Sequence, residues 1–298
     1  MITPEKINIG DKIGIISTAR KISFKELKPA IDILESWGLK VVFGKFLFEE
    51  YNQFSGNTSQ RVADLQNMID NEDIKAILCA RGGYGTVQII DKIDFSALSQ
   101  NPKWIIGYSD ITVLHSHLNQ LGFATLHATM PINFCENTPQ SLESFKNAIF
   151  GKENFIKTLP HNFNRIGKVE AEIIGGNLSI LYSLLGSISD VNTDHKILFL
   201  EELDEYLYHV DRMMINMKRN GKFQKLKGMV IGGMSNMNDN DIPFGKTAEE
   251  IVCEHVKEYD FPICFNFPSG HLDDNRGIKL GVSSVLDINE NGVTLSQV

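Results

Sequence analysis

The segment Trp104-Ile105-Ile106-Gly107-Tyr108-Ser109-Asp110-Ile111-Thr112 joins a short apolar run to the start of a helical pattern. The apolar run is typical of a buried strand, and apolar residues continue at helical spacing from Ile111 to Leu121. A serine on such a turn lies at the edge of a sheet, where its hydroxyl is exposed and the helix dipole favours an oxyanion. Ser109 is therefore a candidate nucleophile. Taken alone, however, the turn favours a plainer interpretation, in which Ser109 is only the N-cap of the helix.

The residues before this segment alternate between strand and helix patterns. We expect strands at 12–17, 39–43, 74–79 and 105–107, with helices at 23–37 and 59–69 and a short helix at 86–90. Such alternation predicts a parallel sheet with right-handed crossovers, the doubly wound α/β class. In this class, ligands bind beyond the carboxyl ends of the strands. Ser109 and the segment Arg81-Gly82-Gly83-Tyr84-Gly85 both fall at such ends.

The first of these helices has two possible starting points. Ser23 and Glu26 match a capping box, which would begin the helix directly after Ser23. Pro29 would then lie inside the helix, where proline causes a kink. The alternative is that Pro29 is itself the first helical residue.

The chain after residue 150 has a different pattern. Residues 151–167 are polar and contain Pro160, so we expect an irregular linker there. Strand patterns dominate the remainder and predict a smaller, β-rich mixed domain. The expected division is therefore an N-terminal domain at 1–150, a linker at 151–167 and a C-terminal domain at 168–298.

Composition excludes several classes of function. The chain has 298 residues, 42% of them hydrophobic, and a formal net charge of −8, which is unfavourable for binding nucleic acid. We expect no membrane segment and no signal peptide, because no apolar run has the necessary length or flanks. The four cysteines are scattered and are expected to be reduced thiols in a cytoplasmic protein.

Familiar cofactor and metal motifs are missing. The glycine-rich segment at 82–85 lacks the full dinucleotide fingerprint, so it is either a tight turn or a cradle for an anion. His115 and His117 are two residues apart on a predicted helix and face different directions, so they cannot bind one metal ion together. We therefore expect no metal and no cofactor.

Three polar groups share one kind of position, the end of a predicted strand. They are Ser109, His271 in Ser269-Gly270-His271, and either Glu201 or Glu202. A serine hydroxyl needs a base to take its proton, and that base needs a carboxylate to hold its tautomer. Their order along the chain occurs in known hydrolytic triads, but it is weak evidence by itself. The segment also departs from the esterase G-x-S-x-G motif, since Ile111 replaces the last glycine.

In combination these motifs resemble the LD-carboxypeptidase family of serine peptidases, which includes the microcin C immunity peptidases. The matching segments are GDKIGIIS, ARGGYG, IIGYSDIT, GGNLSILYSLLGS, LFLEELDEYLYHVDRM and SGH, and they span most of the chain. The resemblance implies a flavodoxin-like N-terminal domain and a smaller β-rich C-terminal domain. The active site would lie in the cleft between the two domains.

The resemblance also implies roles for individual residues. Ser109 would be the nucleophile, His271 the general base and Glu201 the carboxylate that orients it. The backbone amides of Gly83 and Asp110 would form the oxyanion hole. Glu202 stands where relatives frequently have aspartate, and residues 272–275 depart from the glycine and asparagine that often follow the histidine.

Substrate contacts are less well defined by the sequence. Arg81 and Tyr84 are expected to bind substrate, and Arg81 and Arg212 are the candidates for its free carboxylate, although either arginine is equally suited to a structural ion pair.

The implied activity is removal of the terminal D-alanine from muropeptide tetrapeptides in peptidoglycan recycling, and the family implies a homodimer. One alternative is a peptidase of the microcin C immunity type, which cleaves aminoacyl-nucleotide conjugates. Another is a non-catalytic protein that binds an anionic ligand through ARGGYG.

Overall fold

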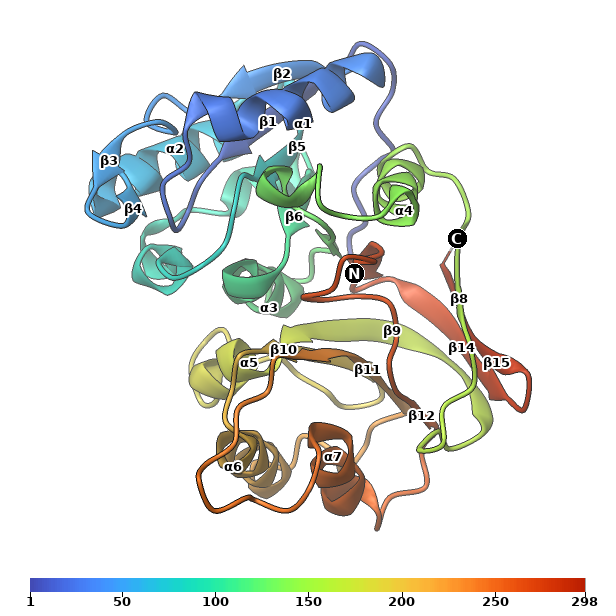
Figure 1. Ribbon diagram of the computed structural model, residues 1–298. Helices are drawn as coiled ribbons and strands as arrows, with labels where there is room; N and C mark the ends of the chain where they lie inside the picture. Colours follow the sequence, from blue (N-terminus) through green and yellow to red (C-terminus); the bar gives the residue numbers. More distant parts are fainter. Residues whose placement is uncertain (298) are drawn as a thin grey trace.

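The structure is a computed structural model that describes residues 1–297. Figure 1 shows two layered halves, with the N-terminal half above and the C-terminal half below. Each half is built on its own sheet, and helix α3 (Thr112–Gln120) lies between the two sheets. A small hairpin of β3 (Glu50–Tyr51) and β4 (Phe54–Ser55) stands beside the first sheet.

The first sheet has six strands in the order β13-β7-β6-β5-β1-β2. The strands are β1 (Lys12–Ile16), β2 (Lys40–Phe43), β5 (Ile74–Cys79), β6 (Trp104–Gly107), β7 (Thr125–His127) and β13 (Ile278–Leu280). The first five pair in parallel, and β13 joins β7 antiparallel. The chain moves outward from β1 to β2 and then crosses back to β5, so the topological switch lies between β1 and β5. The predicted doubly wound α/β class is confirmed.

Helices cover both faces of this sheet because its strands are apolar on both sides. Ile13 and Ile15 of β1 pack with α1 (Phe24–Ser36) and α4 (Pro139–Ile149) on one face. Ile16 packs on the other face, among the side chains of α2 (Thr58–Asp70) and α3. Buried strands with this two-sided pattern are characteristic of parallel sheets.

Local signals set the ends of these helices. Helix α1 begins at Phe24, with the Ser23 side chain accepting from Glu26 N and the Glu26 side chain accepting from Ser23 N. Pro29 lies inside the helix, so a start at Pro29 is wrong. The short helix predicted at 86–90 is instead a pair of 3₁₀ turns, η1 (Thr86–Gln88) and η2 (Ile90–Lys92). Further 3₁₀ turns are η3 (Ser96–Ser99), η4 (Ser109–Ile111) and η5 (Pro131–Asn133).

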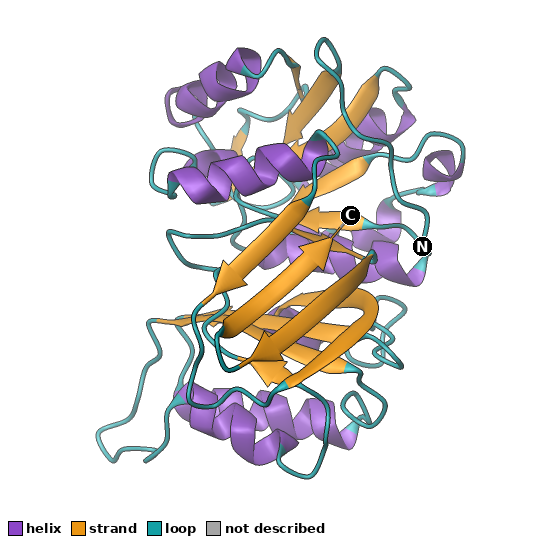
Figure 2. Cartoon of the chain, turned by 90° about the vertical axis from the view of Figure 1, so that its right-hand side faces the viewer, coloured by secondary structure: helices purple, strands orange, loops and turns teal. Residues whose placement is uncertain are grey.

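The second sheet has seven strands in the order β12-β11-β10-β9-β14-β15-β8. They are β8 (Asn154–Thr158), β9 (Gly167–Asn177), β10 (Ile197–Leu203), β11 (Gly228–Ser235), β12 (Ile263–Cys264), β14 (Ser283–Asn289) and β15 (Gly292–Gln297). Strands β9 to β12 pair in parallel and the rest antiparallel. Helices α5 (Leu178–Leu184), α6 (Leu207–Arg219) and α7 (Ala248–Val256) cover one face. Figure 2 shows this sheet between the N-terminal half and helices α6 and α7.

Two features of the second half differ from a simple two-domain arrangement. Strand β8 lies within the segment 151–167, where we expected an irregular linker, so that expectation is wrong. Strand β13, far along the chain, completes the first sheet by pairing with β7. The two halves therefore share strands as well as surfaces, and the limits expected at 150 and 168 remain a prediction.

Candidate active site

Ser109 lies directly beyond the carboxyl end of β6, as the first residue of η4. Its φ is 62°, in the left-handed region that residues other than glycine rarely adopt. Such strain recurs at nucleophile turns, because it projects the side chain out of the strand-to-helix path. No side-chain cap is present at η4 or at α3, so the interpretation of Ser109 as a helix cap is wrong.

The glycine loop after β5 lies against Ser109. A Cβ atom placed on Gly82 would lie 3.0 Å from Ser109 Cβ, which is tighter than most contacts between side chains. Gly83 has φ of +115° and is exposed, and its N–H has no acceptor among residues 1–297. Glycine suits this position because side chains rarely allow such a φ, and because a Cβ atom would lie 2.7 Å from Arg20 Cδ. The loop therefore presents a free amide beside the serine.

The Asp110 side chain ties this loop to the serine turn. Its Oδ2 atom accepts from Thr86 N at 2.9 Å and from Thr86 Oγ1 at 2.7 Å. Burial raises the pKa of Asp110, while the two hydrogen bonds from Thr86 and the charge of Arg61 act in the opposite direction. Arg61 itself is buried and donates to the carbonyl oxygens of Thr18 and Gly85. Asp110, through Thr86, and Arg61, through the Gly85 carbonyl, thus both hold the end of the glycine loop in place.

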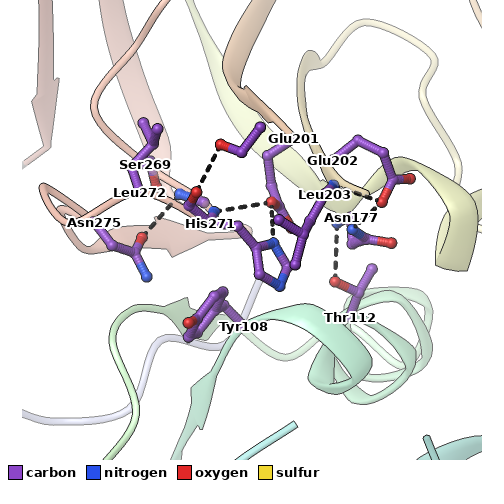
Figure 3. Close-up of polar contacts among 12 residues, drawn as sticks. Tyr108, Thr112, Asn177, Glu201, Glu202, Leu203, Ser269, His271, Leu272 and Asn275 are labelled. Carbon is purple, nitrogen blue, oxygen red and sulfur yellow. Dashed lines mark hydrogen bonds and ion pairs between the residues drawn. The ribbon is translucent and has the colours of Figure 1, made fainter. Parts of the chain in front are cut away.

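His271 and Glu201 form a hydrogen-bonded pair on the second half (Figure 3). Glu201 Oε2 lies 2.6 Å from His271 Nδ1 and also accepts from His271 N at 3.1 Å. Glu201 is fully buried. Burial alone would lower the pKa of His271, but the charge and hydrogen bond of Glu201 outweigh burial and raise this pKa above its usual value. Since Nδ1–H donates to the carboxylate, Nε2 is left as the basic atom.

The loop carrying His271 is fixed by its own short contacts. Gly270 has φ of +107°, and a Cβ atom there would lie 2.6 Å from Glu201 Cβ. Asn275 Oδ1 accepts from Gly270 N, and Ser235 Oγ donates to the His271 carbonyl. The unusual residues 272–275 therefore still support the histidine loop, through Asn275.

Glu202 has a different task from Glu201. Its Oε1 accepts from Asn177 Nδ2 and Leu203 N, and its Oε2 accepts from Ser179 N. Burial and then the charge of Glu201 raise the pKa of Glu202 to about 7. Asn177 N in turn donates to Thr112 Oγ1 on α3, one turn after the serine. Glu202 thus supports the contact between the halves, and it makes no hydrogen bond to His271.

An open cavity of about 240 Å³ lies between the two halves. Its lining includes Ser109, Gly83 and Arg81 from the first half and His271 from the second. The Tyr108 ring lies 4.9 Å from the His271 ring between centroids, and its hydroxyl donates to Asn133 Oδ1. Gly82 and Tyr108, from the two motifs that the sequence singled out, also line it, and the lining residues that sequence reasoning missed are Arg20, Met130, Ile132, Asn133 and Leu203.

Two residues expected to contact substrate lie outside this lining. The Tyr84 ring is exposed and packs against Phe54 at 6.3 Å between centroids. The Arg212 guanidinium lies over the Tyr208 ring on α6.

Among residues 1–297, no group of three or more histidine, cysteine or acidic side chains is placed to hold a metal ion. No helix in that same range combines the length and apolar character needed to cross a bilayer.

Comparison with known proteins places the chain in a family. Residues 13–128 match the LD-carboxypeptidase N-terminal domain and residues 170–286 match the LD-carboxypeptidase C-terminal domain. The chain belongs to the LD-carboxypeptidase family. It is therefore a serine carboxypeptidase, as the sequence resemblance predicted.

Relatives in this family carry two kinds of name. The chain is 33% identical to the probable murein peptide carboxypeptidase of Bacillus subtilis, over 96% of this chain and 92% of the relative. It is 27% identical to the murein tetrapeptide carboxypeptidase of Pseudomonas aeruginosa, over 94% of each. It is also 26% identical to the microcin C7 self-immunity protein MccF of Escherichia coli, over 97% and 94%.

A solved structure confirms the fold. The muramoyltetrapeptide carboxypeptidase from Oxalobacter formigenes superposes with a TM-score of 0.88 at 24% identity, covering 96% of this chain and 98% of its own. The two-domain architecture that the resemblance implied is thus the architecture of the family.

Proposed function

We propose that this protein is a serine LD-carboxypeptidase that releases the terminal D-alanine from muropeptide tetrapeptides. One observation carries the proposal: Ser109, in a left-handed turn, and His271, paired with buried Glu201, line the same cavity from opposite halves. The names of the murein-processing relatives support the choice of substrate. The glycine loop beside Ser109 supports an acyl-transfer mechanism.

In the first step, Ser109 Oγ attacks the carbonyl carbon of the last peptide bond. His271 Nε2 takes the hydroxyl proton, while Glu201 holds the ring and stabilises its charged form. The carbonyl oxygen becomes an oxyanion, which accepts from the amides of Gly83 and Asp110. Two preorganised donors of this kind are commonly among the largest contributions to rate.

In the second step, the C–N bond breaks. His271 gives its proton to the departing amine, and D-alanine leaves with its carboxylate intact. A water molecule then attacks the acyl-serine ester, and His271 takes one of its protons. Collapse of the second tetrahedral intermediate restores the Ser109 hydroxyl and frees the shortened peptide.

A second candidate is cleavage of aminoacyl-nucleotide conjugates, because the MccF relative is nearly as similar as the Pseudomonas carboxypeptidase. The observation that bears on this is an exposed aromatic pair, Tyr206 and Tyr208, 5.6 Å apart between centroids. The two rings are outside the lining of the catalytic cavity. We therefore rank the muropeptide first.

The cellular setting is also part of the proposal. Release of D-alanine from tetrapeptides belongs to peptidoglycan recycling, and such a reaction fits a cytoplasmic enzyme. The scattered cysteines, all unpaired in the structure, agree with a reducing compartment. A homodimer remains an expectation from the family.

Mass spectrometry of a purified muropeptide tetrapeptide, before and after incubation with the enzyme, tests the proposal. We expect loss of one alanine residue with the wild-type protein and no loss with Ser109→Ala. A parallel incubation with an aminoacyl sulfamoyl adenosine separates the two candidates. Faster hydrolysis of the nucleotide conjugate than of the tetrapeptide would favour the second one.

A further inference from the structure

Two guanidinium groups that form no salt bridge border the catalytic cavity. Arg20 and Arg81 both line it, together with Ser109 and His271. Neither arginine forms an ion pair within residues 1–297. Among the carboxyl groups of that range, only Glu26 has a pKa that one of them is seen to lower: two hydrogen bonds with Ser23 lower it most, and the charge of Arg81 lowers it less. The lining also contains no aspartate or glutamate. In a chain of net charge −8, this cavity is therefore a local site of positive charge.

The fold places both arginines at the topological switch of the first sheet. Arg20 lies on the loop after β1, and Arg81 lies on the loop after β5, the strand that pairs with β1. Crevices at this point of an open parallel sheet are the usual ligand sites of the class. The backbone at Arg20 is held by Ser17, whose Oγ donates to the Arg20 carbonyl. Arg81 is half-buried, and its Nη1 donates to the Lys21 carbonyl at 3.1 Å.

Arg20 lies close to the reacting centre. A Cβ atom placed on Gly83 would come within 2.7 Å of Arg20 Cδ and 2.8 Å of Arg20 Nε. Gly82 makes the matching approach to Ser109 on the other side of the loop. The guanidinium of Arg20 is thus next to the amide proposed to hold the oxyanion.

The substrate of a carboxypeptidase has its terminal carboxylate close to the bond that is cleaved. Only the amide nitrogen and one carbon atom separate the carbonyl carbon of the last peptide bond from the terminal carboxylate. A planar guanidinium matches a carboxylate with two parallel hydrogen bonds, which fixes orientation as well as charge.

We propose that Arg20 and Arg81 bind the terminal carboxylate of the leaving residue and thereby restrict cleavage to the last bond of the peptide. This inference rests on the proposed function. Arg81 is the preorganised partner, because its hydrogen bond to Lys21 and its partial burial hold it in place. Arg20 is the exposed partner, beside the Gly83 amide.

The test compares two substrates that differ only at the carboxylate: the tetrapeptide acid and the same peptide with a C-terminal amide. The wild-type enzyme should prefer the acid. Arg20→Gln and Arg81→Gln should each lower kcat/KM for the acid by roughly ten- to a hundredfold and lower kcat/KM for the amide by a much smaller factor, so that the preference for the acid falls. Arg20→Lys should fall between, since lysine keeps the charge and loses the bidentate geometry.

Arg219→Gln, at an exposed position at the end of α6, is the matched control and should keep the wild-type preference. Labelling of Ser109 by a phosphonate confirms that each variant is folded. If both cavity variants keep the wild-type preference for acid over amide, the carboxylate site is wrong while the proposed function stands. If the wild-type enzyme cleaves neither peptide, the proposed function and the inference built on it both fail.

Discussion

Glu201 Oε2 accepts two hydrogen bonds from one residue, His271, through the backbone N–H and the ring Nδ1–H. The first fixes the loop and the second fixes the tautomer, so a single buried oxygen sets both the place and the protonation of the base. Because Glu201 lies in β10 and Ser109 follows β6, the proposed base and nucleophile are positioned by different sheets. In the proposed mechanism, the packing of the two halves is therefore part of the catalytic apparatus.

Replacement of Glu201 by glutamine should lower kcat by roughly 10³- to 10⁴-fold, because the amide no longer holds the productive tautomer. His271 must be neutral to accept a proton, so kcat/KM should fall as the pH drops through the His271 pKa. Glu201 holds this pKa above 6.5, against burial. In Glu201→Gln burial dominates, and the acid limb of the pH–rate profile should move to lower pH.

The matched control for this experiment is Glu202→Gln. Glu202 bonds to Asn177, Leu203 N and Ser179 N, so its replacement should move the acid limb much less. If the acid limb moves in Glu202→Gln and stays in place in Glu201→Gln, then Glu202 and not Glu201 is the carboxylate that orients His271.

A second prediction concerns the close approach of Gly270 to Glu201. In Gly270→Ala, the new methyl group would meet Glu201 Cβ at 2.6 Å and displace either the loop or the carboxylate. Gly186→Ala is the control, since Gly186 also has positive φ but has open space around its Cβ position. Both variants should lose about 1–2 kcal/mol in the free energy of unfolding from backbone strain.

Only Gly270→Ala should also lose activity, by at least about tenfold if the carboxylate moves by a fraction of an ångström. Chemical denaturation and steady-state kinetics on the two variants measure the two effects separately. Equal activity in both would mean that the Gly270 contact has no part in positioning Glu201.

A third prediction concerns the tie between the serine turn and the glycine loop. Thr86→Val removes the hydroxyl that donates to Asp110 Oδ2 and leaves a buried acceptor with one fewer partner, at a cost of about 1–3 kcal/mol in stability. The loop carrying Gly83 should then be less well placed, so kcat should fall roughly tenfold while KM changes little.

Thr18→Val is the control for this prediction, because Thr18 contacts the Thr86 hydroxyl but leaves both bonds to Asp110 in place. It should keep kcat within about twofold of wild type. A fall in kcat of similar size in both variants would assign the effect to general loosening of the core instead.

The sequence predicted those parts of the site that depend on local patterns. The apolar run before Ser109 and the helical spacing after it set the strand-to-helix turn, and both lie within a few residues. The glycines at 82, 83 and 270 could also be singled out from the sequence, because each belongs to a short motif at the end of a predicted strand. Strand ends in a parallel sheet gather at one edge, so the meeting of Ser109 with the Gly83 loop also followed from the fold class.

The remainder depends on contacts between distant segments. Strand β10 has an irregular register between Leu200 and Glu202, so both glutamates are buried and simple alternation does not tell which one faces His271. Arg20 lies in a loop with no periodic pattern, and its approach to Gly83 depends on β1 and β5 being neighbours. Strand β13 completes the first sheet from more than a hundred residues away in sequence, a pairing that no local signal indicates.

The proposed function requires that Ser109 is a nucleophile activated by a base from the other half. Labelling with a fluorophosphonate, followed by peptide mass spectrometry, measures this activation at Ser109 itself. We predict a single adduct on Ser109 in the wild-type protein and a rate of labelling at least about a hundredfold lower in His271→Ala, since the hydroxyl then keeps its proton. An adduct on another residue, or labelling of Ser109 at an unchanged rate in His271→Ala, would contradict the claim.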